Sequence, residues 1–162
     1  MKEIEVKNFT KDYGYGRGVF DISFEVNKGE VLGFLGPNGA GKSTTIRHLM
    51  GFSKPDKGST KILGKDTFEN YVSFMDKVGY LPGEIALPDG LTGYQLLDMM
   101  KKMKGCKDDK WIKYLMDYFE VDAHGETKRM SLGVKRKMAI VIAFMHDPDI
   151  LILDEPTSGL DL

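Results

Sequence analysis

The sequence predicts an α/β fold in which a parallel core sheet is flanked by a small antiparallel β subdomain and carries an inserted helical subdomain. Uncharged apolar runs at 31–35, 78–81 and 150–153 have the length and composition of buried parallel strands. Between the last two runs, residues 84–129 change to helical periodicity. We therefore expect one domain, with its core and β subdomain in 1–83 and 130–162.

The antiparallel part is predicted from alternating apolar and polar residues in two segments. Residues 1–9 and 19–26 alternate in this way and are separated by a glycine-rich stretch, while 27–29 turns the chain toward the run at 31–35. A further strand is expected at 59–63, followed by a turn at 64–66. These strands predict a small sheet beside the parallel core.

Two helices are expected in the inserted segment. Thr92 is a suitable N-cap for a helix that continues to Gly105, and Asp108 or Asp109 could start a second helix with Trp111 on its apolar stripe. The segment shows no heptad pattern, which argues against a coiled coil.

Composition excludes several classes of protein. The 162 residues carry a net charge of −1, which gives no reason to expect a nucleic-acid partner. No apolar stretch approaches the roughly 18 residues that cross a bilayer, and no signal peptide opens the sequence, so we expect any link to a membrane to run through a partner protein. The single cysteine, Cys106, cannot form an internal disulfide, which fits a reducing cytoplasm, and its polar neighbours predict an incidental surface thiol.

A phosphate-binding loop is predicted at residues 36–44. The segment Gly36-Pro37-Asn38-Gly39-Ala40-Gly41-Lys42-Ser43-Thr44 fits the pattern Gly-x-x-x-x-Gly-Lys-[Ser/Thr] and stands between the apolar run 31–35 and a helix that we expect to close at Gly51. Its glycines let backbone N–H groups surround phosphate oxygens, and the helix N-terminus adds partial positive charge. Lys42 would reach the β- and γ-phosphates, and the Ser43 hydroxyl would bind Mg²⁺.

Two carboxylates follow the apolar run at 150–153. The carboxyl end of a parallel strand is where open α/β sheets place ligands, so Asp154 is a candidate Mg²⁺ ligand and Glu155 a candidate base for an attacking water. The alternative interpretation is a pair of acids that ends a strand and caps the next helix. Because the pair follows a phosphate-binding loop in the same chain, we favour the catalytic interpretation.

A third motif narrows the family. Met130-Ser131-Leu132-Gly133-Val134 leads, through three basic residues, into an apolar helix that ends at Asp147-Pro148 before the acidic strand. Here the sequence resembles the ATP-binding subunits of ABC transporters, whose signature reads Leu-Ser-Gly-Gly-Gln. Ser131 and Gly133 match it, whereas Leu132 replaces the first glycine and Val134 the glutamine. Taken alone, Ser131 is an ordinary N-cap. The basic run 135–137 is typical of a solvated helix face, and the alternative is that it adds positive charge near the nucleotide.

The resemblance spans essentially the whole chain and implies a P-loop NTPase (RecA-like) core that binds ATP with Mg²⁺. It implies that Tyr13 stacks on adenine, and that Ser131 and Gly133 contact ATP on a second, head-to-tail subunit. It further implies a dimer-interface loop formed by Ser158, Gly159, Leu160 and Asp161. The sequences of the signature and of residues 80–84 are most similar to those of bacterial exporters that pair with ABC-2-type membrane subunits. This resemblance implies a transmembrane permease partner and a cytoplasmic position at the inner face of the membrane.

Two departures from the family pattern stand out. Gly83 occupies the place of a glutamine that contacts Mg²⁺ and the attacking water, with Glu84 as a neighbouring substitute whose role stays open. The family's switch histidine lies some thirty residues beyond the catalytic glutamate, and none of His48, His124 and His146 is placed to replace it. His48 and His146 fall in predicted helices. We therefore expect the chain to be truncated at its C-terminus, without the last strands of the sheet.

The expected function is ATP binding and hydrolysis that powers export through a partner membrane subunit. Two alternatives stay open: a soluble ABC-type ATPase of DNA repair or translation, and a nucleotide-binding module without efficient hydrolysis. The absence of heptads argues against the first alternative, and the expected C-terminal truncation together with Gly83 favours the second. These residues do not identify the transported substrate. They also do not indicate whether the two ATP-binding subunits form a homodimer or a heterodimer.

Overall fold

The computed structural model describes residues 2–159. The chain forms two compact units, Met1–Met75 and Asp76–Leu162. The predicted division into a core and an inserted subdomain at 84–129 stays a prediction.

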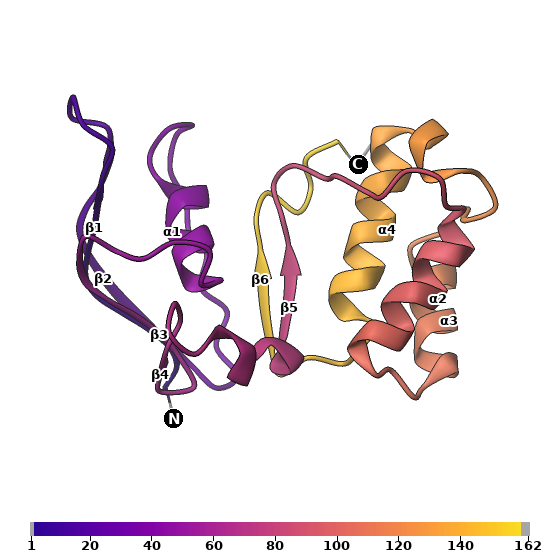
Figure 1. Cartoon of the computed structure of the whole chain (residues 1–162), viewed down its shortest axis with the longest axis horizontal. Coiled ribbons are helices and arrows are strands. Elements are labelled where there is room, and N and C mark those ends of the chain that lie inside the picture. Colours follow the sequence, from indigo (N-terminus) through magenta and orange to yellow (C-terminus); the bar gives the residue numbers. More distant parts are fainter. Residues whose placement is uncertain (1, 160–162) are drawn as a thin grey trace. The chain divides into compact units, whose positions relative to one another are not determined.

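The first unit contains the predicted antiparallel sheet. Its strands lie in the order β2-β1-β3-β4, and each neighbouring pair is antiparallel. Val6 is the Cα partner of Phe24 on one side and of Thr60 on the other. Figure 1 shows this sheet, whose strands are β1 (Lys2–Asp12), β2 (Gly18–Asn27), β3 (Lys57–Ile62) and β4 (Lys65–Asp66).

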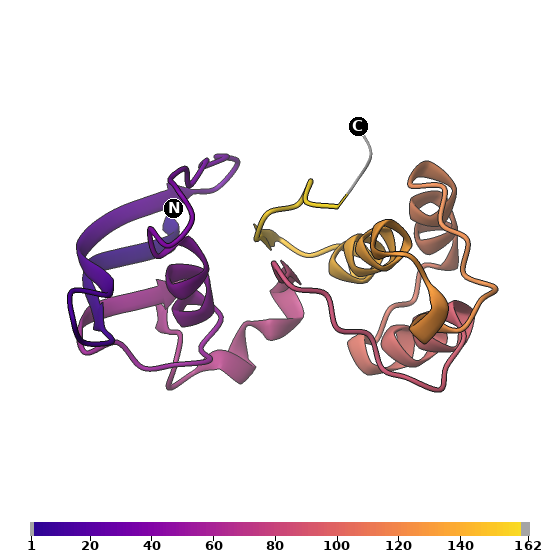
Figure 2. The same ribbon diagram turned by 90° about the horizontal axis from the view of Figure 1, so that it is seen from above.

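Helix α1 (Lys42–Leu49) lies beside this sheet, as Figure 2 shows from above. The buried ring of His48 lies 4.8 Å from that of Phe9 in β1, and its carbonyl accepts a 2.8 Å hydrogen bond from Thr67 Oγ1. The helix ends where expected, since Gly51 adopts a left-handed φ of 73°. It begins at Lys42, inside the predicted phosphate-binding loop.

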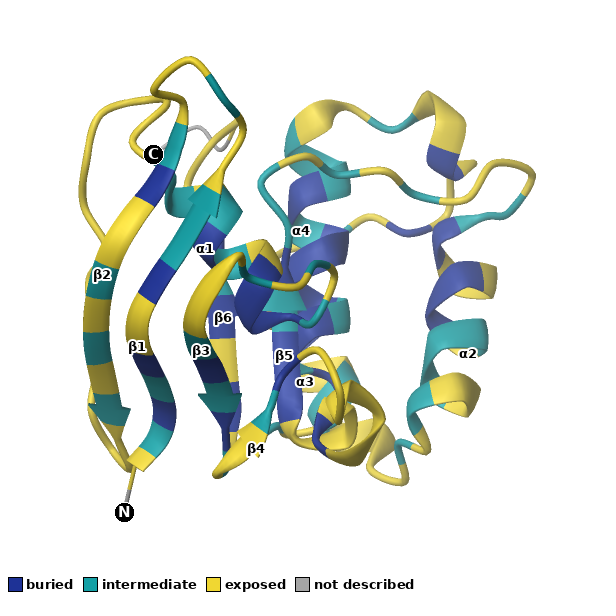
Figure 3. Cartoon of the chain, turned by 60° about the vertical axis from the view of Figure 1, so that its left-hand side comes forward, coloured by how far each residue is buried: buried dark blue, intermediate teal, exposed yellow. Residues whose placement is uncertain are grey.

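The prediction of a buried strand at 31–35 is wrong for this structure. Residues 31–37 have no regular secondary structure, and every residue from 28 to 40 is exposed, as the yellow colour in Figure 3 marks. Val31 and Leu35 are 96% and 94% exposed. A buried strand needs a hydrogen-bonding neighbour and covered faces, and within residues 2–159 no strand pairs with this run.

The second unit contains the predicted parallel pair. Strand β5 (Val78–Leu81) and strand β6 (Ile150–Leu153) are parallel, with Val78 opposite Ile150 and Leu81 opposite Leu153. Helix α4 (Leu132–Phe144) packs on the pair through a cluster of buried residues: Leu81, Ala139, Ile140 and Ala143. The carboxyl ends of β5 and β6 therefore lie side by side.

Both predicted helices of the inserted segment are present. Thr92 and Gln95 form a reciprocal capping box at the start of α2 (Gly93–Lys104), which ends at left-handed Gly105, and Asp108 caps α3 (Asp109–Tyr118). With α4 these helices enclose a core of Leu96, Leu97, Leu115, Ala123, Met138 and Val141. Short 3₁₀ turns occur at Tyr71–Ser73, Met75–Lys77 and Thr127–Arg129.

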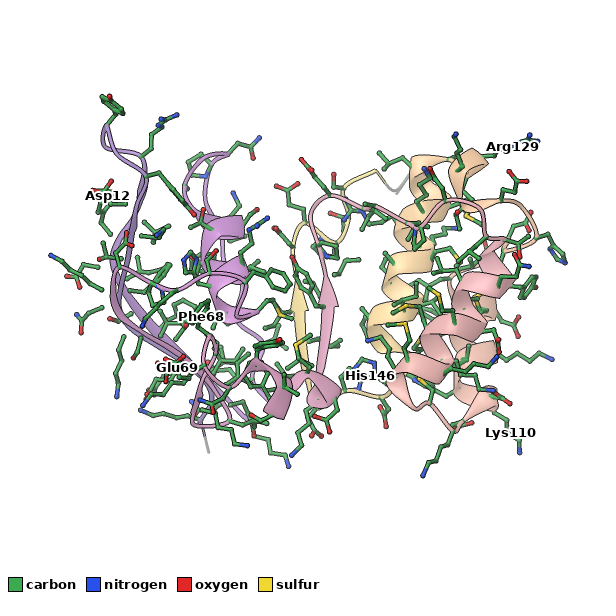
Figure 4. The ribbon with its side chains drawn as sticks, in the orientation of Figure 1. Asp12, Phe68, Glu69, Lys110, Arg129 and His146 are labelled. Carbon is green, nitrogen blue, oxygen red and sulfur yellow. The ribbon has the colours of Figure 1, made fainter. Side chains whose placement is uncertain are left out.

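Two smaller expectations need correction. His146 follows α4, which ends at Phe144, so it lies in the connection to β6 and not in a helix; Figure 4 labels it there. Cys106 is half-buried, and this burial raises the pKa of its thiol. Across residues 2–159, no helix has both the length and the apolarity that a membrane span requires.

Candidate nucleotide-binding site

The predicted phosphate-binding loop leads directly into α1. Gly39 and Gly41 have φ angles of 84° and 88°, a left-handed conformation that favours glycine, and the Ala40 N–H closes a turn on the Pro37 carbonyl at 3.1 Å. The packing also requires glycine at 41, because a Cβ there would lie 2.2 Å from Val19 Cγ2 of β2. The backbone at Gly41 therefore passes close to Val19 of the sheet.

The first turn of α1 is open to an anion. Gly41, at the N-cap, offers no side-chain acceptor, and the first turn contains no acidic residue. Thr45 N–H already bonds to the Gly41 carbonyl at 2.9 Å, which leaves the amides of Lys42, Ser43 and Thr44 without an intrahelical acceptor. These free donors and the helix dipole favour a phosphate at this end.

The Lys42 side chain folds back over the loop. Its ammonium donates hydrogen bonds to the carbonyl oxygens of Gly36 at 2.6 Å and Pro37 at 2.9 Å. Two neutral acceptors of the loop therefore hold the cation, and anionic phosphate oxygens can replace them with a stronger charge-assisted bond.

Tyr13 follows the end of β1 in the same unit. The residue is 52% exposed, and the Lys11 ammonium lies 5.8 Å from the centroid of its ring. The Tyr13 N–H donates to the Arg17 carbonyl at 2.8 Å, which fixes the backbone of the glycine-rich turn. An exposed aromatic on an ordered turn can stack on a base.

The two predicted carboxylates emerge from β6 in different environments. Asp154 is only 5% exposed, while Glu155 is exposed and adopts a left-handed φ of 48°. Among residues 2–159, no donor binds the Asp154 carboxylate, although its N–H bonds to the Leu81 carbonyl at 2.9 Å. The carboxylate oxygens of this largely buried residue still contact solvent, so they are open to a cation. The strained backbone at Glu155 is typical of functional sites.

The loop after β5 lies directly against Asp154. A Cβ placed on Gly83 would come within 3.1 Å of Asp154 Oδ2 and 3.3 Å of Cγ. The absence of a side chain at 83 therefore gives the carboxylate its space. Glu84, the neighbouring acid, is exposed.

The signature segment begins α4. Ser131 is the exposed N-cap, and its Oγ accepts a 3.3 Å hydrogen bond from the Val134 N–H. A Cβ on Gly133 would meet the Gly159 carbonyl at 3.3 Å, so the loop after β6 lies over the start of α4. Ser158 and Gly159 are described and exposed, whereas Leu160 and Asp161 lie outside the described residues.

The interpretation of 135–137 as a solvated face is wrong for Arg136, which is 2% exposed. Its guanidinium donates to the carbonyl oxygens of Pro82, Gly83 and Ser158. The burial could have been predicted from spacing, because Arg136 precedes Ile140 and Ala143, which face β5, by four and seven residues.

The matches with known proteins extend over this whole arrangement. Residues 19–158 match the ABC transporter family. The chain belongs to this family. It is an ATP-binding, nucleotide-binding domain of the ABC transporter type, and the relatives below are all named ATP-binding proteins.

Curated relatives match almost the whole chain. It is 38% identical to the uncharacterized ABC transporter ATP-binding protein YhcH of Bacillus subtilis (strain 168), over 98% of the chain and 52% of that protein. It is 35% identical to the bacitracin transport ATP-binding protein BcrA of Enterococcus faecalis and 37% identical to the linearmycin resistance ATP-binding protein LnrL of Bacillus subtilis (strain 168), over the same shares. The chain thus spans about half the length of these relatives.

Solved structures agree with the fold. An ATP-binding subunit of an ABC transporter superposes with a TM-score of 0.86 at 30% identity, covering 98% of this chain and 68% of that one. A dimeric ABC transporter cassette superposes with a TM-score of 0.82 at 23% identity, over 98% of this chain and 76% of that one. The likeness confirms the P-loop NTPase fold class.

The predicted site residues fall in both units. Tyr13 and residues 36–44 belong to Met1–Met75, whereas Asp154, Glu155 and the signature belong to Asp76–Leu162. The convergence of Lys42 and Asp154 on one triphosphate stays a prediction.

Proposed function

We propose that this chain binds and hydrolyses ATP to drive export through a membrane permease subunit. The observation that carries the proposal is the carboxylate of Asp154 at the end of β6, in a chain whose α1 begins at an uncapped phosphate-binding loop. Among residues 2–159 this carboxylate accepts no hydrogen bond, and its oxygens stay in contact with solvent although the residue is only 5% exposed. A helix N-terminus suited to phosphates and a carboxylate suited to Mg²⁺ are the two elements of an ATP site.

On binding ATP, Lys42 exchanges the carbonyls of Gly36 and Pro37 for the β- and γ-phosphate oxygens. The free amides at the start of α1 receive the remaining phosphate charge, and the Ser43 hydroxyl would hold the metal. Tyr13 stacks on the adenine ring. In this proposal the backbone amides of residues 36–44 bind the phosphates, and Tyr13, in the turn after β1, binds the adenine.

Mg²⁺ fits the oxygen donors available, namely the Ser43 hydroxyl, the Asp154 carboxylate and the phosphates, and when bound it neutralises charge on the β- and γ-phosphates. Glu155 accepts a proton from a water molecule as that water attacks the γ-phosphorus and the bond to the β-phosphate oxygen breaks. Its exposed side chain, beside a buried Asp154, leaves it free to reach the water.

The partners of the proposal are a second ATP-binding subunit and a permease. Ser131 and Gly133 stand at the exposed start of α4, where they would contact ATP bound by the second subunit, with Ser158 to Asp161 at the interface. Closure on ATP and reopening after hydrolysis would shift the permease between conformations at the inner face of the membrane. Relatives named for bacitracin transport and linearmycin resistance support the export direction.

The test separates binding from hydrolysis in the full-length protein. We expect Glu155→Gln to reduce turnover at least 100-fold while ATP binding persists, and Lys42→Ala to weaken ATP binding itself. The exposed lysine Lys113 of α3 serves as a charge control, so Lys113→Ala should match the unchanged protein. ATP binding with no turnover in the unchanged protein would support the alternative, a nucleotide-binding module, which Gly83 favours.

A further inference from the structure

Arg136 is a buried cation without a carboxylate partner. Its Nε donates to the Ser158 carbonyl at 3.0 Å, Nη1 to the Pro82 carbonyl at 3.0 Å and Nη2 to the Gly83 carbonyl at 2.8 Å. Among the described residues no acidic side chain pairs with it. Only 2% of the residue is exposed, so these three carbonyls replace its hydration.

The three carbonyls belong to two separate loops. Pro82 and Gly83 follow β5, and Ser158 follows β6, while Arg136 itself lies in the second turn of α4. A guanidinium donates in fixed directions from a planar group, so it holds its acceptors in one geometry. Lysine, a single flexible ammonium, cannot reproduce this arrangement.

Each of these segments also touches a predicted site residue. The Gly83 backbone lies against the Asp154 carboxylate, and the Gly159 carbonyl lies against Gly133 of the signature. Arg136 therefore stands between the signature at the start of α4 and the carboxylate at the end of β6. Within Asp76–Leu162, a shift of either loop would be transmitted through the same guanidinium.

We propose that Arg136 is a positioning residue that couples the signature, which reads the partner subunit's ATP, to the Asp154–Glu155 carboxylates that act on the chain's own ATP. This inference rests on the proposed function. It predicts that Arg136 sets the turnover rate and the cooperativity between the two ATP sites. ATP affinity at the phosphate-binding loop depends on residues 36–44 and should change little.

The experiment compares Arg136→Lys and Arg136→Met with Lys113→Met in the full-length protein, by ATP turnover as a function of ATP concentration. We expect both Arg136 variants to lose about 10- to 100-fold in kcat with KM within about 2-fold, and to lose ATP cooperativity. Lys113→Met, which removes an exposed charge, should leave all three parameters unchanged. Unchanged kcat and cooperativity in Arg136→Lys would overturn the proposal.

A double-mutant cycle separates coupling from simple loss of fold. If Arg136 acts through the signature, adding Ser131→Ala to Arg136→Lys should reduce kcat by much less than Ser131→Ala does alone. Full additivity of the two substitutions would overturn the proposal, because the two residues would then act independently. If circular dichroism showed that both Arg136 variants are unfolded, the proposal would also be overturned, because Arg136 would then serve stability. A different result would contradict the proposed function itself: the absence of ATP turnover in the unchanged protein.

Discussion

The Cα of Gly83 faces the carboxylate of Asp154 so closely that an added Cβ would lie 3.1 Å from Oδ2. This contact joins the loop after β5 to the candidate Mg²⁺ ligand after β6, and the parallel pairing of the two strands brings it about. The place that the family gives to a glutamine is here occupied by the one residue that fits beside the carboxylate without displacing it.

We therefore expect Gly83→Ala to displace the Asp154 carboxylate by a few tenths of an ångström. Misplacing a metal ligand slows the chemical step more than it weakens binding, so Mg²⁺-dependent ATP turnover should fall about 3- to 10-fold. Gly125→Ala is the matched control, since a Cβ there meets nothing within 4 Å. Equal turnover in the two variants would show that the contact does not matter to the metal site.

Two glycines of the phosphate-binding loop should differ sharply in their tolerance of alanine. At Gly39 and Gly41 alike, alanine must adopt a left-handed φ, which destabilises by about 1 kcal/mol. Only at 41 does the new Cβ also collide with Val19 Cγ2, at 2.2 Å. Urea unfolding should show Gly41→Ala to be the less stable variant by at least about 1 kcal/mol. Adding Val19→Ala to Gly41→Ala should recover part of the lost stability. If it recovers none, the clash with Val19 is not the source of the difference.

His146 should make stability depend on pH. Burial first, and the positive charge of Lys104 second, lower the pKa of His146, whose Nδ1 lies 3.3 Å from the Lys104 ammonium and whose Nε2 lies 3.1 Å from the Val78 carbonyl. Below its unfolded pKa of 6.5, the unfolded chain binds more protons at this ring than the folded chain, so the free energy of unfolding should fall as the pH falls.

The measurement is the denaturation midpoint between pH 8 and pH 5, compared with His146→Gln. Glutamine keeps a hydrogen-bonding side chain and does not titrate, so the decline below pH 6.5 should become shallower in the variant. Identical slopes would show that His146 is not the group responsible.

The capping box of α2 should contribute measurably to stability. Thr92 Oγ1 accepts from the Gln95 N–H at 3.2 Å, and the Gln95 side chain accepts from the Thr92 N–H at 2.8 Å. Thr92→Ala should lower the free energy of unfolding by about 1 kcal/mol, while Thr92→Ser should retain most of it, as chemical denaturation would report. If Thr92→Ser lowered the free energy of unfolding as much as Thr92→Ala does, the methyl group of Thr92, and not its hydroxyl, would be the source of the stability.

Local signals in the sequence were sufficient for most elements. The caps at Thr92 and Asp108, the turn glycine Gly105 and the alternation along β1 and β2 act over a few residues, so each could be read without knowing the fold. The apolar run 31–35 has no such local determinant. Strand formation there depends on a distant pairing partner, which residues 2–159 do not provide.

Arg136 shows why part of the site was missed. Its neighbours Lys135 and Lys137 suggested a solvated face, yet the position lies on the stripe that faces Leu81 of β5. Its charge is compensated by backbone carbonyls, which no sequence pattern reveals. The resemblance to the family had placed Gly83 near the metal site, whereas its close contact with the Asp154 carboxylate follows only from the pairing of β5 with β6.

The central proposal, that the Lys42 loop and Asp154 serve one Mg·ATP, is tested most directly by metal affinity in the ATP complex. Mn²⁺ binding to the protein with ATP bound, followed by electron paramagnetic resonance, should weaken at least about 10-fold in Asp154→Asn, while ATP binding without metal stays unchanged. Equal Mn²⁺ affinity in Asp154→Asn and the unchanged protein would contradict the account.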